Sequence, residues 1–84
     1  MSYTVEYIQN KLSEKLKASH VEVVDHSDGC GTKLVVLVVS NSFAGKPMLQ
    51  RHRLVNSALK EELKSIHAFS QKTLTPEEWE KQKA

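Results

Sequence analysis

The chain has 84 residues, of which 39% are hydrophobic and 26% are charged, and its formal net charge is +2 at pH 7. This length allows one domain with a single modest core, and the composition excludes both a disordered chain and a membrane-spanning one. So small a net charge also excludes strong nucleic-acid binding from overall charge alone, so any such binding depends on a local cluster of cations.

Two further features predict the compartment. The N-terminal residues contain neither the apolar core of a signal peptide nor an Arg-rich presequence. The lone Cys30 can form no internal disulfide, which agrees with a reducing environment. We therefore expect a cytoplasmic protein that also enters the nucleus.

The first predicted element is an amphipathic helix, which either Thr4 or Ser2 can cap. Its apolar residues repeat with helical spacing, at Val5, Ile8, Leu12 and Leu16. The charged residues between them fall on the opposite side of the helix and predict a solvated face.

Two strands and a loop follow. The short, β-branched run Val21–Asp25 predicts the first strand, and the continuous apolar run Leu34–Val39 is typical of a central strand that is buried on both faces. Between them, His26–Thr32 predicts a loop in which two glycines flank Cys30.

A second helix and a third strand come next. The helix is predicted from Pro47 to Lys64, because apolar residues repeat there at a spacing of four. These residues are Val55, Leu59 and Leu63. The third strand is predicted at Ile66–Phe69.

The last helix has a strong start signal. Thr75 is its N-cap, a proline follows, and Glu78 completes a capping box. Leu74 and Trp79 occupy the positions of a hydrophobic staple. We expect residues 79–84 to fray, because the tail from Glu80 to Ala84 is polar.

These elements give the order αββαβα. A strand–helix–strand unit favours a right-handed crossover between parallel strands, while two consecutive strands favour an antiparallel hairpin. The prediction is therefore one α+β domain over residues 1–84, with a mixed three-stranded sheet and helices packed mainly on one face.

A cluster of cations marks the start of the second helix: Lys46, Arg51, His52 and Arg53. No acid follows until Glu61. Because the helix dipole disfavours cations in the first turns, the cluster needs an explanation outside helix stability. Three interpretations remain open, namely a solvated basic face, a protein-docking patch and a nucleic-acid contact.

The elements FAGK, RHRLVN, EEL, IHAF and TPEEW, in this order and spacing, resemble the BolA family, and in particular its cytosolic branch that partners monothiol glutaredoxins. The resemblance covers nearly the whole chain, from the first helix to Trp79. It implies the BolA fold, which is similar to a type II KH domain. It also implies a protein that is not an enzyme, in agreement with the lack of a nucleophile motif, a Gly-rich phosphate loop or a paired metal motif.

The resemblance implies two ligands for a [2Fe–2S] cluster. In the matching IHA motif of the family the histidine is a cluster ligand, which assigns that role to His67. The cytosolic branch tends to carry a cysteine in the loop after the first strand, which makes Cys30 the second ligand, with His26 as the alternative. From the residues alone, His67 would be a hydrogen-bonded strand histidine and Cys30 an exposed thiol.

Two ligands are too few, because a [2Fe–2S] cluster takes four. In the resembling proteins the missing ligands are the active-site cysteine of a monothiol glutaredoxin and the thiol of a bound glutathione. We therefore expect no cluster in the isolated chain. For Cys30 and His67 to share one cluster, the third strand must run parallel to the central strand, and His67 should lie on the same sheet face as Phe69.

The predicted function is a non-enzymatic iron–sulfur adaptor that forms a [2Fe–2S]-bridged heterocomplex with a monothiol glutaredoxin, for cluster assembly, delivery to apo iron–sulfur proteins or iron sensing. The predicted partner-binding residues are Lys46, Arg51, His52, Arg53 and Phe69. The alternative is a KH-like nucleic-acid-binding or transcription-regulating module that uses Lys46, Arg51 and Arg53. This alternative is weakened because KH domains clamp nucleic acid with a GXXG loop, which the chain lacks. No membrane partner is expected.

Overall fold

The computed structural model describes residues 4–26, 33–66 and 68–83. In chain order they form α1 (Val5–Leu16), β1 (Ala18–Asp25), β2 (Lys33–Ser40), the short 3₁₀ helix η1 (Asn41–Phe43), α2 (Met48–Ala58), the 3₁₀ helix η2 (Glu62–Ser65), β3 (Ala68–Leu74) and α3 (Pro76–Lys83). None of the helices in these ranges has the length and apolar character needed to cross a bilayer.

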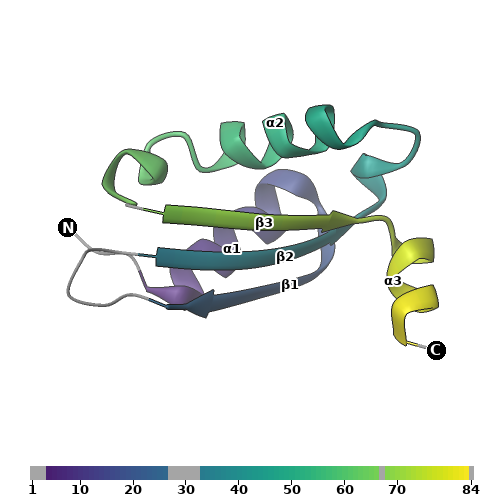
Figure 1. The fold of residues 1–84 in the computed structure, drawn as a ribbon, viewed down its shortest axis with the longest axis horizontal. Helices are drawn as coiled ribbons and strands as arrows, with labels where there is room; N and C mark the ends of the chain where they lie inside the picture. The colour runs from purple at the N-terminus through teal and green to yellow at the C-terminus, as the bar shows by residue number, and fades with distance from the viewer. Residues whose placement is uncertain (1–3, 27–32, 67, 84) are drawn as a thin grey trace.

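The three strands form one mixed sheet in the order β1-β2-β3. β1 pairs with β2 in the antiparallel direction, and β3 pairs with β2 in the parallel direction. The chain between β2 and β3 contains α2, which lies alongside the sheet in Figure 1. The predicted α+β fold, with its antiparallel hairpin and parallel crossover, is confirmed.

Two helices cover one face of the sheet, and the third covers one end of the other face. Alternate residues of β2 are buried in the core with α1 and α2: Leu34, Val36 and Val38. The residues between them face the opposite side, where Val35 is exposed but Val39 is fully buried. α3 lies at this end, since the Trp79 ring stacks on His20, the β1 partner of Val39. Figure 1 shows α1 behind the strands and α3 where β3 ends.

The helix start signals are confirmed. The Thr4 side chain caps α1 by accepting a hydrogen bond of 3.0 Å from the Tyr7 N–H. At α3 the capping box is complete, because the Glu78 N–H donates to Thr75 Oγ1 and the Thr75 N–H donates to Glu78 Oε1. α3 continues to Lys83, beyond the point where fraying was expected.

Both outer strands are longer than predicted. β1 begins at Ala18 rather than Val21, and β3 spans Ala68–Leu74 rather than Ile66–Phe69. Each residue from Ala68 to Leu74 has a partner on β2, so backbone pairing sustains a strand whose sequence is largely polar. Strand propensity depends on such neighbours more than on the residues themselves.

The second helix is shorter than predicted, because α2 ends at Ala58 rather than Lys64. Leu59 leaves the helical conformation, and a turn leads into η2. The new direction places the Glu62 carboxylate at the surface of α1, where it accepts hydrogen bonds from Tyr7 and Lys11. Leu59 remains fully buried, so the apolar spacing found the core residue but not the helix end.

Candidate functional site

The end of the sheet where β2 and β3 begin is the candidate ligand site, and we call it the ligand end. The parallel register pairs Lys33 with Ala68. The His26 N–H donates a hydrogen bond of 2.8 Å to the Lys33 carbonyl, which closes the base of the intervening loop. Cys30 and His67 lie outside the described residues, but the chain segments that carry them join the sheet at this end.

The requirement for a parallel third strand is confirmed. His26, the alternative second ligand, is exposed at the base of the loop. Phe69 is half-buried and packs against the core, whereas Ala68 is exposed, so side chains alternate between the two faces here. The expectation that His67 shares the face of Phe69 concerns a residue outside the described ranges and stays a prediction.

The part of the chain that the structure describes holds no group of three or more His, Cys, Asp or Glu side chains placed to bind a metal ion. Two of the four histidines lie away from the ligand end. His20 stacks on Trp79 under α3, and His52 lies in the second turn of α2. Among the described histidines, only His26 lies at the ligand end.

A small apolar strip flanks the ligand end on the face that α1 and α2 leave open. Val24 and Val35 are directly paired across β1 and β2, and they are 47% and 40% exposed. Leu37, two residues further along β2, is half-buried. Exposed valines on one sheet face at the ligand end are suited to contact a protein partner.

The cation cluster lies at the opposite end of the sheet, where β2 and β3 finish, and we call this the α3 end. Arg53 is exposed, while His52 and Lys46 are half-buried. The Lys46 ammonium group donates a hydrogen bond of 3.0 Å to the Ser42 carbonyl. β2 has eight residues, so roughly 25 Å of strand separates this cluster from the ligand end.

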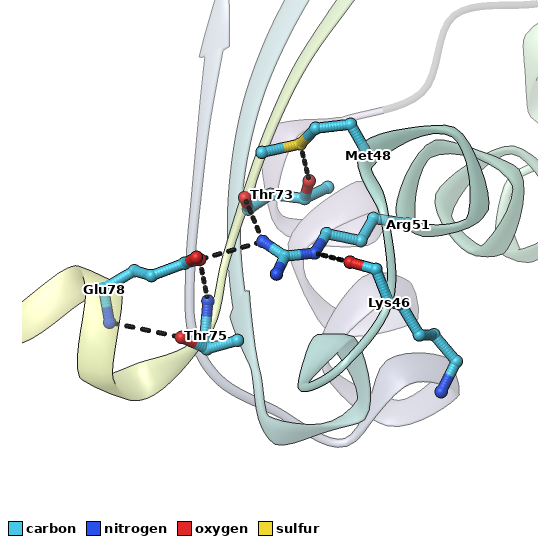
Figure 2. A network of polar contacts seen from close by, with 6 residues as sticks. All are labelled: Lys46, Met48, Arg51, Thr73, Thr75 and Glu78. Atoms are coloured by element: carbon cyan, nitrogen blue, oxygen red, sulfur yellow. Dashed lines mark hydrogen bonds and ion pairs between the residues drawn. The ribbon is translucent and has the colours of Figure 1, made fainter.

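Arg51 differs from the rest of the cluster, because it is only 7% exposed. Its Nε donates to the Lys46 carbonyl at 2.8 Å, and Nη1 donates to Glu78 Oε1 at 2.8 Å and to the Thr73 carbonyl at 3.4 Å. Figure 2 shows the guanidinium lying between α2, the end of β3 and the start of α3. The assignment of Arg51 to partner binding stays a prediction, but the structure gives no support to it, since the guanidinium is buried and its charge is used internally.

Glu78 completes this contact. The hydrogen bond from Arg51 and that from the Thr75 N–H hold the pKa of the Glu78 carboxyl below its usual range. One carboxylate thus both caps α3 and pairs with Arg51, which ties the last helix to the body of the domain (Figure 2).

The sequence contained a signal for the position of Arg51. It lies four residues before Val55, on the same helix face as the apolar residues of α2, so the helical period places it toward the core. No pattern in the sequence singled out His20. Its ring stacks on that of Trp79, with ring centroids 4.8 Å apart and ring planes 20° apart. This stacking contact involves Trp79, whose predicted staple with Leu74 stays a prediction.

Glu62 is another buried charge that sequence reasoning did not single out. It is 1% exposed, and Oε2 accepts hydrogen bonds from the Tyr7 hydroxyl at 2.6 Å and from Lys11. Burial alone would raise its pKa, but these hydrogen bonds and the Lys11 charge outweigh burial, so the net pKa of Glu62 is lowered. The ion pair anchors η2 to α1 just before the chain enters β3.

The fold and its motifs have clear relatives. A family model described as BolA-like protein matches residues 12–78. BolA-like protein 2 of Mus musculus is 56% identical over 84 residues, which cover 99% of this chain and 98% of that protein. A crystal structure of a Bol-like protein from Babesia bovis superimposes with a TM-score of 0.91 at 39% identity, covering 100% of this chain and 98% of that one.

A more distant relative carries a functional name. The DNA-binding transcriptional regulator BolA of Vibrio cholerae is 39% identical over 80 residues, covering 87% of this chain and 76% of that protein. The family model spans most of the sequence, and the identities are high across nearly full-length alignments. The chain therefore belongs to the BolA family.

Proposed function

We propose that this chain is a non-enzymatic adaptor that forms a [2Fe–2S]-bridged heterocomplex with a monothiol glutaredoxin, in the cytoplasm and nucleus. His67 and Cys30 each supply one ligand, with His26 as the alternative to Cys30. The glutaredoxin cysteine and its bound glutathione supply the other two. The complex hands its cluster to apo iron–sulfur proteins or reports iron status.

The observation that carries this proposal is the parallel pairing of Lys33 with Ala68. It brings the loop that holds Cys30 back to the sheet beside the residue that follows His67. An antiparallel third strand would have put the two segments at opposite ends of a sheet roughly 25 Å long.

The supply of ligands supports a shared cluster rather than a resident one. The chain has one cysteine and four histidines, and His20 and His52 lie away from the ligand end. Even with His26 included, we expect the ligand end to offer at most one thiolate and two imidazoles, whereas a [2Fe–2S] cluster takes four ligands and a structural zinc site also takes four. A partner that brings thiolates completes the set.

The open strip beside the ligand end supports a protein partner. Val24 and Val35 offer apolar surface that a docked glutaredoxin would bury, so the contact does not depend on the cluster alone. A weak apolar contact made before the cluster arrives would hold the two proteins together at the ligand end.

Co-expression with a monothiol glutaredoxin tests the proposal. We expect a coloured heterocomplex with one [2Fe–2S] unit, and we expect His67→Ala to change the visible absorption and circular-dichroism bands and to weaken cluster retention. Cys30→Ala and His26→Ala, measured in parallel, identify the second ligand as the variant with the larger spectral change.

His52→Ala is the matched control, because it removes an imidazole at the other end of the molecule. It should leave the spectra and the cluster content unchanged. Wild-type spectra for the His67→Ala complex would remove His67 from the ligand set, and a colourless wild-type mixture would refute the shared cluster.

A second candidate function is nucleic-acid binding, which the name of the Vibrio cholerae relative favours. Arg53 and Lys46 could contact phosphates, but Arg51 pairs with Glu78 and is withdrawn from the surface. A duplex gel shift that Arg53→Glu abolishes, with glutaredoxin binding intact, would establish this function instead.

A further inference from the structure

We infer that the first turns of α2 form a second docking surface, which binds an acidic amphipathic segment of a protein other than the glutaredoxin. The surface, here called the α2 surface, consists of Met48, Leu49 and Arg53, with Lys46 and His52 at its rim. It lies at the α3 end of the sheet.

The two apolar members are the most exposed large hydrophobic side chains among the described residues. Leu49 is 63% exposed and Met48 is 53% exposed. Arg53 follows Leu49 by four residues, so the two are neighbours on the outer side of the helix, whereas Met48 and the half-buried His52 are neighbours on the flank beside the buried face. The Met48 sulfur is held in place, since it accepts a hydrogen bond of 3.6 Å from the Thr73 hydroxyl.

Helix formation does not explain these residues. The first turn of α1 has the Thr4 cap and Glu6, and the first turn of α3 has the Thr75 cap and two acids. α2 begins after Pro47 with no side-chain cap and no acid, although both would stabilise it. The start of α2 thus lacks the stabilisation of a cap and an acid, and it exposes two large apolar side chains to solvent. Such a surface is suited to binding another protein.

The charge of the α2 surface indicates which kind of segment it binds. The sequence from Lys33 to Lys60 contains no Asp or Glu. Arg53 is exposed, and within the described ranges no acid pairs with it. The electrostatic potential over Met48 and Leu49 is therefore positive. A complementary partner is a segment with apolar residues on one face and carboxylates at its edges, such as an amphipathic acidic helix.

The position of the surface allows two partners at once. α2 has eleven residues, so about 16 Å of helix separates its start from the turn that leads to β3. A glutaredoxin held at the ligand end leaves the start of α2 accessible. Simultaneous binding of the glutaredoxin rests on the proposed function, whereas the binding of the acidic segment does not.

A labelled synthetic peptide provides the test. It carries leucines on one helical face and glutamates on the other, and a second peptide of the same pattern carries lysines in place of glutamates. We expect fluorescence anisotropy to show binding of the acidic peptide only, both to the free chain and to the glutaredoxin heterocomplex. Leu49→Glu should weaken binding about tenfold or more, because it removes a buried leucine contact and adds a repelling charge.

Leu49→Glu also separates binding from folding, because an acid in the first turn of α2 should raise the melting temperature. Arg53→Glu should weaken binding, whereas Lys60→Glu, the same charge change beyond the far end of α2, should not. Equal binding of the two peptides, or unchanged binding by Leu49→Glu, would overturn the inference, as would tighter binding of a DNA duplex than of the peptide. Loss of peptide binding in the heterocomplex alone would overturn simultaneous occupancy.

Discussion

The two ends of the sheet use the same kinds of side chain for different purposes. At the α3 end, Arg51 is buried and pairs with Glu78, and the Trp79 ring covers His20. At the ligand end, His26 is exposed and Val24 and Val35 lie uncovered on the open face. Charged and aromatic groups thus hold the last helix at one end, while imidazole and apolar groups remain accessible at the other.

This difference shows that side-chain type does not by itself separate a structural site from a binding site. Arg51 and Arg53 are two residues apart, yet the first is 7% exposed and the second is fully on the exposed side of α2. Two factors decide which cation is structural: the side of α2 on which the residue lies, and the presence of an acid on the element packed against that side. The five predictions below test the contrast between the two ends of the sheet.

The largest expected effect is that of Arg51→Ala. It removes hydrogen bonds to the Lys46 and Thr73 carbonyls and leaves Glu78 without its partner, so we expect the free energy of unfolding to fall by about 2–4 kcal/mol. Urea denaturation measures the loss. Arg53→Ala, the matched exposed change, should alter it by less than about 0.5 kcal/mol. Similar losses for the two variants would contradict the division between the residues.

Glu62→Gln tests how η2 is anchored near the ligand end. It keeps the size of the side chain but removes the charge that Lys11 and Tyr7 bind, so the free energy of unfolding should fall by about 1–3 kcal/mol. Because the pKa of Glu62 is lowered in the folded state, its stabilisation is present above the glutamate pKa of the unfolded chain.

The same linkage predicts a pH dependence. The contribution of Glu62 disappears as the pH falls through its lowered pKa, so wild-type protein should lose stability over the acid range and Glu62→Gln should lose less. Melting temperatures of the two proteins between neutral and acid pH measure this. Parallel curves would show that the carboxylate is not linked to folding.

The open strip predicts a smaller effect, on association rather than stability. The double change Val24→Thr and Val35→Thr keeps β-branched side chains but reduces apolar surface, so glutaredoxin affinity should fall several-fold, or about 1 kcal/mol, with little change in stability. Isothermal titration with the glutaredoxin measures it. Leu49→Thr, at the other end, is the control and should leave that affinity unchanged. If glutaredoxin affinity fell only in Leu49→Thr, the glutaredoxin would contact the α3 end instead of the open strip.

The smallest effect is expected for His20→Ala. It removes the stacking partner of Trp79, which should lower the free energy of unfolding by about 0.5–1 kcal/mol and shift the emission of this single tryptophan to longer wavelength. His52→Ala should not change the emission. An unshifted spectrum for His20→Ala would mean that the ring pair does not hold α3 in solution.

Much of the architecture was readable from local pattern. The apolar stripe of α1, the continuous apolar run of β2 and the capping box at Thr75 each specify their element by themselves, and the crossover rule supplied the parallel strand. For the same reason the motif order led to the family, which the comparisons then established. The ligand assignments for Cys30 and His67 depend on that family resemblance and stay predictions.

The sequence by itself determined the order of the elements, the faces that α1 and α2 bury and the family of the chain, because these depend on residues close to one another in sequence. Only the tertiary structure decided where α2 ends, how far β3 extends and which acid compensates the buried charge of Arg51. Each of these outcomes depends on a distant partner: Lys11 for Glu62, the whole of β2 for β3, and Glu78 for Arg51. A charged side chain is buried only where such a partner compensates its lost hydration, and that partner cannot be found in a local pattern.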